Sequence, residues 1–79
     1  MKLKLHEAIA VILLSKEGRN ASIQEIADEI NMRELYERKD GTALPAYQVM
    51  QRTKLAGGQY HHLFDYLEGG FVRLKDLDK

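Results

Sequence analysis

The chain has 79 residues, twelve of them basic and twelve acidic, so its formal net charge is zero. This charge balance predicts no general attraction to nucleic acid or anionic lipid. There is no cysteine, which excludes disulfides and thiolate metal sites and is compatible with the reducing cytoplasm. The longest apolar run, residues 8–14, is far shorter than the ~20 residues that cross a bilayer. We predict one domain over residues 1–79, with its core at about 3–75.

Residues 3–16 have the spacing of an amphipathic helix. The expected inner stripe consists of Leu5, Ala8, Ile9, Ile12 and Leu13. Val11 and Leu14 fall on another side of this helix, so the helix has apolar residues nearly all round. Either the C-terminal part of the chain covers these two side chains, or a partner does, and a homodimer through Val11 and Leu14 is one such arrangement.

A turn at residues 16–21 separates this helix from the next, and Gly18 is expected to end the first helix in a left-handed conformation. Ser22 then begins the sequence S-I-Q-E, a capping box. The Ser22 hydroxyl would accept the Glu25 N–H, and the Glu25 carboxylate would reach back to the Ser22 N–H. The second helix has an inner stripe of Ile23, Ile26, Ala27 and Ile30. Its outer face carries Glu25, Asp28 and Glu29, which we interpret as a solvated face.

The helical periodicity weakens after Asn31. Leu35 and Tyr36 are expected to be buried, and residues 36–38 could form a short strand before the turn at Asp40-Gly41. This segment therefore connects the second helix with a third.

The third helix is expected from Pro45 to about Leu55, because proline suits a first helical position and Gly57-Gly58 stops the helix. Its inner stripe is Ala46, Val49, Met50 and Thr53, and its outer face is Tyr47, Gln48, Gln51, Arg52 and Lys54. From Gly41 through Phe64 there is no acidic residue. Gln and Arg side chains fit purine edges in a major groove. The outer face is therefore either a DNA-reading surface or an ordinary solvated helix face.

Residues 60–67 and 71–74 are rich in aromatic and aliphatic side chains, and Glu68-Gly69-Gly70 separates them, which predicts a hairpin. In a strand, Val72 and Leu74 would share one face and Phe71 and Arg73 the other. We expect the aromatic rings in the core rather than stacked on bases. His61 and His62 would point to opposite faces and cannot chelate one ion together. We find no catalytic constellation, and predict neither an enzyme nor a cofactor.

Three helices followed by a hairpin predict a mainly α fold with a small antiparallel β-hairpin (α+β), in the order of a winged helix-turn-helix. From about Leu5 to Leu74 the sequence resembles the HARE-type helix-turn-helix family, the winged-helix module of Asx-like chromatin proteins, some restriction enzymes and the delta subunit of RNA polymerase. The resemblance rests on the apolar first helix, Gly18 before Glu25-Ile26, Thr42 and Pro45, Phe64, and the closing GFVRL of residues 70–74. Asn20 replaces a common proline, and two residues separate Thr42 from Pro45.

The resemblance implies a cytoplasmic or nuclear module that binds double-stranded DNA in transcription regulation. The DNA-facing positions it implies are Tyr47, Gln48, Gln51, Arg52 and Lys54 on the third helix, Thr42 at a phosphate, and Arg73 and His61 at the backbone. The alternative is a protein-interaction module of the same fold that docks on RNA polymerase or another partner. The zero net charge, the acidic second helix and Glu68 at the hairpin tip favour that alternative.

Overall fold

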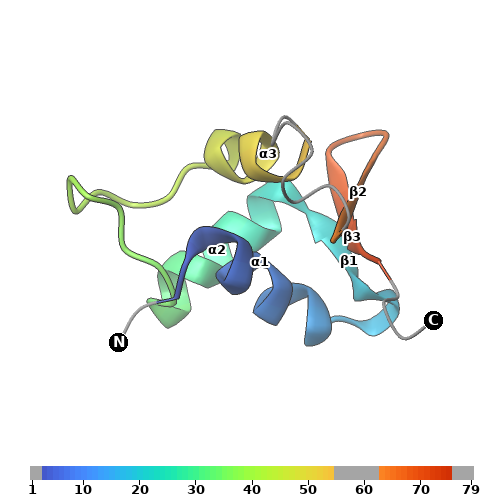
Figure 1. Ribbon diagram of the computed structural model, residues 1–79, viewed down its shortest axis with the longest axis horizontal. Helices are drawn as coiled ribbons and strands as arrows, with labels where there is room; N and C mark the ends of the chain where they lie inside the picture. The colour runs from blue at the N-terminus through green and yellow to red at the C-terminus, as the bar shows by residue number, and fades with distance from the viewer. Residues whose placement is uncertain (1–2, 55–62, 76–79) are drawn as a thin grey trace.

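The computed structural model describes residues 3–54 and 63–75. These residues form three helices and a three-stranded antiparallel sheet in a winged-helix layout (Figure 1). In chain order they are α1 (Leu5–Leu14), the 3-10 turn η1 (Glu17–Arg19), β1 (Asn20–Ser22), α2 (Ile23–Arg33), α3 (Ala46–Lys54), β2 (Phe64–Leu67) and β3 (Phe71–Leu74). Within these ranges no helix is long and apolar enough to cross a membrane.

The inner stripes of the first two helices are where the sequence predicts them. All five residues of the α1 stripe are buried, as are Ile26, Ala27 and Ile30 of α2, whereas Ile23 is half-buried. The Ser22 hydroxyl accepts the Glu25 N–H at 3.0 Å, which confirms the N-cap of α2. The end of α1 differs from the prediction, because the helix stops at Leu14 with Ser15 as its C-cap. Gly18 has a left-handed φ of 76°, but it lies in η1.

The sheet contains a strand that the sequence pattern does not predict. β1 pairs with β3, so the strand order is β1-β3-β2. The β2–β3 hairpin is confirmed, although β2 begins at Phe64 among the described residues. Val72 is buried and Leu74 half-buried, while Phe71 and Arg73 are exposed, as the alternation predicts. Gly70 O accepts the Ile23 N–H at 2.8 Å, which attaches the hairpin turn to the start of α2.

The core lies between the helices and the inner face of the sheet. Its largest fully buried side chains are Ile9, Ile12, Leu13, Ile26, Ile30, Val49 and Val72. Val11 and Leu14 remain 38% and 58% exposed, so the expectation that the hairpin covers them is wrong. Leu35 and Tyr36 are half-buried, and residues 36–38 form no strand.

The connection between α2 and α3 is fixed by one side chain. Asn31, in the last turns of α2, donates from Nδ2 to Leu44 O at 3.0 Å and accepts the Leu44 N–H on Oδ1 at 2.8 Å. These two bonds satisfy both backbone groups of Leu44, whose side chain is buried. The chain therefore enters α3 at a defined place beside α2, with the hairpin next to α3 on the other side (Figure 1).

Candidate nucleic-acid interface

Two residues set the orientation of α3. Val49 and Thr53 are buried, and Ala46 and Met50 are half-buried beside them, which confirms the predicted inner stripe. The Thr53 hydroxyl donates to Val49 O at 2.9 Å, so its buried polar group is satisfied within the helix. This packing against α1, α2 and β2 determines which side chains of α3 reach the surface.

The exposed face of α3 centres on Tyr47 and Gln51. Tyr47 is 59% exposed, and Gln51, four residues later, is half-buried. Gln51 Nε2 donates to the Tyr47 hydroxyl at 3.0 Å, so the two side chains lie against each other on one stripe of the helix. The bond uses one amide hydrogen of Gln51 and leaves its carbonyl oxygen as an acceptor. This pair has the donor and acceptor groups that contact base edges.

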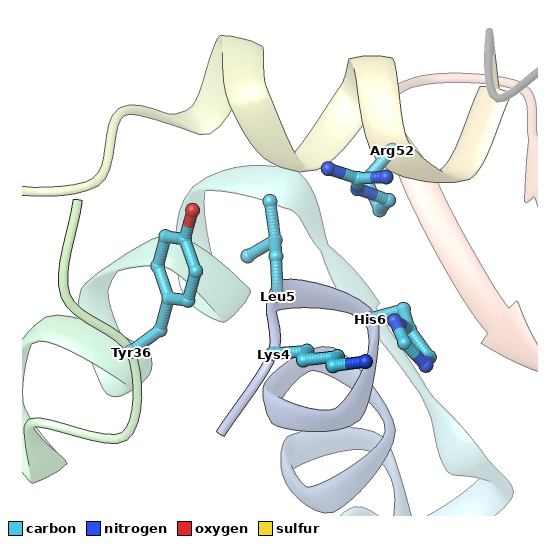
Figure 2. A pocket seen from close by; sticks show the side chains of 5 residues that line it. All are labelled: Lys4, Leu5, His6, Tyr36 and Arg52. Atoms are coloured by element: carbon cyan, nitrogen blue, oxygen red, sulfur yellow. The ribbon is translucent and has the colours of Figure 1, made fainter. Parts of the chain in front are cut away.

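Arg52 does not share that face, and its predicted outward position is corrected. Its side chain is half-buried with a buried Nε, and it extends from α3 towards the first turn of α1 (Figure 2). Successive residues of a helix are rotated by about 100°, so residues four apart lie on nearly the same side. Arg52 therefore shares a flank of α3 with Gln48, beside the stripe of Tyr47 and Gln51. That flank faces α1. Arg52 and Leu5 both border a hollow of about 240 Å³ there.

The residues around this hollow include three polar side chains that sequence reasoning missed. Lys4, His6 and Tyr36 line it together with Leu5 and Arg52 (Figure 2). Lys4 and His6 belong to the start of α1, and Tyr36 to the segment after α2. Their meeting with Arg52 depends on how α1 and α3 pack, and no local sequence pattern reports that packing.

Thr42 is held within its own loop. Its hydroxyl accepts a hydrogen bond from Arg38 Nη1 at 2.8 Å and donates to Asp40 Oδ1 at 2.7 Å. The same carboxylate oxygen accepts the Thr42 N–H at 3.0 Å. These hydrogen bonds from Thr42, and the Arg38 charge, hold the pKa of Asp40 below its ordinary value. A phosphate at Thr42 would have to replace one of these bonds and approach an ionised carboxylate.

Arg73 is paired across the hairpin. It faces Asp65 in the β2–β3 register, and its Nη2 donates to Asp65 Oδ2 at 2.9 Å. Lys75 Nζ lies 3.6 Å from the other carboxylate oxygen. The hydrogen bond from Arg73 is the main reason why the pKa of Asp65 is lowered, and the Lys75 charge adds to it. Together, Arg73, Lys75 and Asp65 carry one net positive charge.

The acidic face of α2 is engaged with cations of its own. Lys16 Nζ donates to Glu25 Oε2 at 2.8 Å and also to Glu29, which pairs with Arg33 at 3.1 Å. The hydrogen bonds to Glu25 and Glu29 raise the pKa of Lys16. The Glu25 carboxylate thus pairs with Lys16. The predicted capping box has this carboxylate accept the Ser22 N–H instead. Glu25 and Glu29 are thus paired with cations, whereas Asp28 accepts a hydrogen bond from Gln24 Nε2 at 2.9 Å.

Two of the predicted positions lie outside the described part of the chain, namely His61 and the side chain of Lys54. The remaining positions divide into three places. Tyr47 and Gln51 lie together, with Gln48 and Arg52 on the adjoining flank, whereas Thr42 and Arg73 are each tied to a nearby carboxylate.

Comparisons of the chain with protein-family models, with curated proteins and with solved structures find no match. The geometry of the molecule therefore supplies the argument for its function.

Proposed function

We propose that the protein is a DNA-binding winged helix-turn-helix protein of the HARE type that acts in transcription regulation in the cytoplasm. The observation that carries this proposal is the exposed face of α3. It presents the hydrogen-bonded pair of Tyr47 and Gln51 beside a hairpin, within a stretch of sequence that has no acidic residue from Gly41 through Phe64. A helix with such a face is the element that enters the major groove in this architecture.

In this proposal the base edges meet Tyr47 and Gln51. A glutamine amide can pair with adenine through one donor and one acceptor, and the free carbonyl of Gln51 supplies the acceptor. Arg52, on the flank, is assigned to the DNA backbone instead of a base. Backbone contacts hold the protein in register, while base contacts read the sequence.

The charge distribution supports a modest affinity. The net charge is zero, and Arg73, Arg38 and Lys16 are each paired with a carboxylate. We expect ~2 to 4 phosphates to be neutralised on binding, which gives a shallow dependence of affinity on salt. A single domain of this size reads few base pairs, so useful specificity would come from two copies on adjacent half-sites.

A charge insertion at two matched positions tests the proposal. Gln51 and Gln24 are both helical glutamines that donate a hydrogen bond to a side chain four residues away, Gln51 on α3 and Gln24 on α2. Fluorescence anisotropy with a random-sequence duplex at about 50 mM salt should show Gln51→Glu binding at least about tenfold more weakly than wild type, because the new carboxylate enters a groove between two rows of phosphates and lacks the amide donor. Gln24→Glu should bind like wild type. Equal effects of the two substitutions, or no binding by the wild type, would reject the proposal.

The second candidate is a protein-interaction module that docks on RNA polymerase or another partner. It is favoured by the apolar side chains left at the surface of α1, Val11 and Leu14, and by the pairing of Arg73 with Asp65. Sedimentation of the wild type and of Leu14→Lys, alone and with purified RNA polymerase, tests this candidate. A complex or homodimer that disappears with Leu14→Lys, in a protein that binds no duplex, would support it over DNA binding.

A further inference from the structure

Polar side chains from two elements border one hollow where the first turn of α1 approaches α3. Arg52 extends from α3, and Lys4 and His6 come from the start of α1 (Figure 2). The Lys4 side chain runs towards the His6 ring, and the Tyr36 hydroxyl points towards α3. One hollow is thus bordered by an ammonium, a guanidinium, an imidazole and a phenol.

The chemistry of this lining suits an oxyanion. Ammonium and guanidinium groups carry only hydrogen-bond donors, and imidazole and phenol can each add one. Hydrogen bonds from a cation to phosphate are about twice as strong as those between neutral groups. The volume of about 240 Å³ is below the range of about 300–1,000 Å³ for pockets that enclose a drug-sized molecule. The hollow is therefore too small to enclose a drug-sized molecule, but it has room for a phosphate group.

A carboxylate also lies at the start of α1. Glu7 Oε1 accepts the Lys4 backbone N–H at 3.0 Å as part of the helix cap. This bond engages the backbone of Lys4, whereas the Lys4 side chain lines the hollow. Lys4 and Arg52 each bring a permanent positive charge to the lining of the hollow.

The position of the hollow connects it with the exposed face of α3. Arg52 and Gln48 form the flank next to Tyr47 and Gln51, and this flank borders α1, while the hairpin lies on another side of α3. A major groove is about 12 Å wide, and the phosphates of the two strands line its two edges. A helix inserted into that groove has a row of phosphates along each flank.

We propose that this hollow binds a phosphate group, and that in a complex with DNA the group is a backbone phosphate at the groove edge on the α1 side of α3. Lys4 and Arg52 carry the charge, and His6 and Tyr36 add donors. The DNA part of this assignment rests on the proposed function, whereas the affinity of the hollow for phosphate can be measured without DNA.

Inorganic phosphate is the first probe. In ¹⁵N NMR spectra, we expect millimolar phosphate to shift the Leu5 and His6 amides and the Arg52 Nε signal in a saturable way. Lys4→Gln and Arg52→Gln should each remove this response. Arg33→Gln is the control, because it neutralises an arginine that pairs with Glu29 on α2. Lys4 is exposed, so Lys4→Gln keeps the test usable should Arg52→Gln fail to fold.

A random-sequence duplex is the second probe. Between about 50 and 200 mM salt, the slope of log affinity against log salt should fall by about 0.9 in Arg52→Gln, the value of one phosphate contact, and stay unchanged in Arg33→Gln. The proposal is overturned when phosphate leaves these signals unmoved or shifts them equally in all variants. Duplex binding with an unchanged slope in Lys4→Gln and Arg52→Gln overturns the DNA part alone. Phosphate binding without duplex binding supports the hollow and rejects the proposed function.

Discussion

Ser22 joins the end of β1 to the start of α2. Its hydroxyl accepts the Glu25 N–H, one of the backbone donors that have no partner inside the helix. Removal of such a cap typically costs about 0.5–2 kcal/mol. We expect Ser22→Ala to lower the free energy of unfolding by about 1 kcal/mol in urea titrations, and Ser22→Asp to retain most of it.

Ser15 provides the control for that measurement. Its hydroxyl donates to Ile12 O at 2.6 Å on an exposed position at the end of α1. Because the Ile12 carbonyl also accepts the Ser15 backbone N–H at 3.1 Å, it keeps a partner in Ser15→Ala, which should change stability by less than about 0.5 kcal/mol. A loss at Ser22 no larger than the loss at Ser15 would contradict the capping role of Ser22.

Gly18 and Gly41 have nearly the same left-handed backbone, with φ of 76° and 75°, but different surroundings. A Cβ at Gly18 would lie 3.1 Å from Asn20 Nδ2, whereas one at Gly41 would meet nothing within 4 Å. Left-handed backbone costs a residue with a Cβ roughly 1–2 kcal/mol. We expect Gly41→Ala to lose about 1 kcal/mol in thermal or urea unfolding. Gly18→Ala should lose the same or slightly more, because the end of the Asn20 side chain can move.

Arg52 illustrates what residue spacing can and cannot predict. The spacing identifies Val49 and Thr53 as the buried positions of α3, and both are buried. It also places Arg52 away from that stripe. Whether a flanking residue faces solvent or a neighbouring helix depends on the crossing of α3 with α1, which is a tertiary property. The sequence pattern therefore could not predict the hollow around Arg52.

At the scale of elements, the hairpin is held by an ion pair that depends on pH. Arg73 and Lys75 lower the pKa of Asp65 in the folded protein below the value of about 3.8 that an unperturbed carboxyl has. The ionised form therefore contributes stability that is fully present above the unfolded pKa. This contribution is lost as the pH falls through the lower folded pKa.

Asp65→Asn isolates that contribution. At pH 7 the substitution should lower the free energy of unfolding by no more than about 1 kcal/mol, because the carboxylate is one-third exposed. In urea titrations, the difference between wild type and Asp65→Asn should shrink as the pH falls below about 3.8 and approach zero below the lower folded pKa of Asp65. If the difference in free energy of unfolding stays constant from pH 7 down to that low pH, the ion pair does not contribute to stability through its charge.

The elements differ in how far their sequences determine them. Stripes of five and four apolar residues mark α1 and α2, and a stripe of three apolar residues and Thr53 marks α3, and the buried sides of the helices follow those stripes. β1 has only Ala21 as a buried residue, and its partner is the distant β3, so no local signal marks it. Residues 36–38 have no neighbouring strand to pair with in the described structure, and they are irregular where a short strand was predicted. Strand pairing is decided by the whole fold, whereas helix hydrogen bonds are local.

At the scale of the whole molecule, the packing divides the surface into regions of different character. Glu25 and Glu29 of α2 are paired with Lys16 and Arg33, and Asp65 is paired with Arg73 and Lys75. The face of α3 is polar and uncharged, and its flank carries the cations around Arg52. The net charge of zero for the whole chain does not show how the charges are distributed over the surface. Our proposal of DNA binding depends on that distribution.

Amide chemical shifts during titration with a random-sequence duplex at about 50 mM salt test the proposal of DNA binding most directly. We predict that the largest changes fall on residues 46–54 of α3, with smaller ones at Lys4 to His6 and at Arg73. Changes confined to α1 around Val11 and Leu14, or no changes at all, would contradict the assignment of α3 as the DNA-contacting helix.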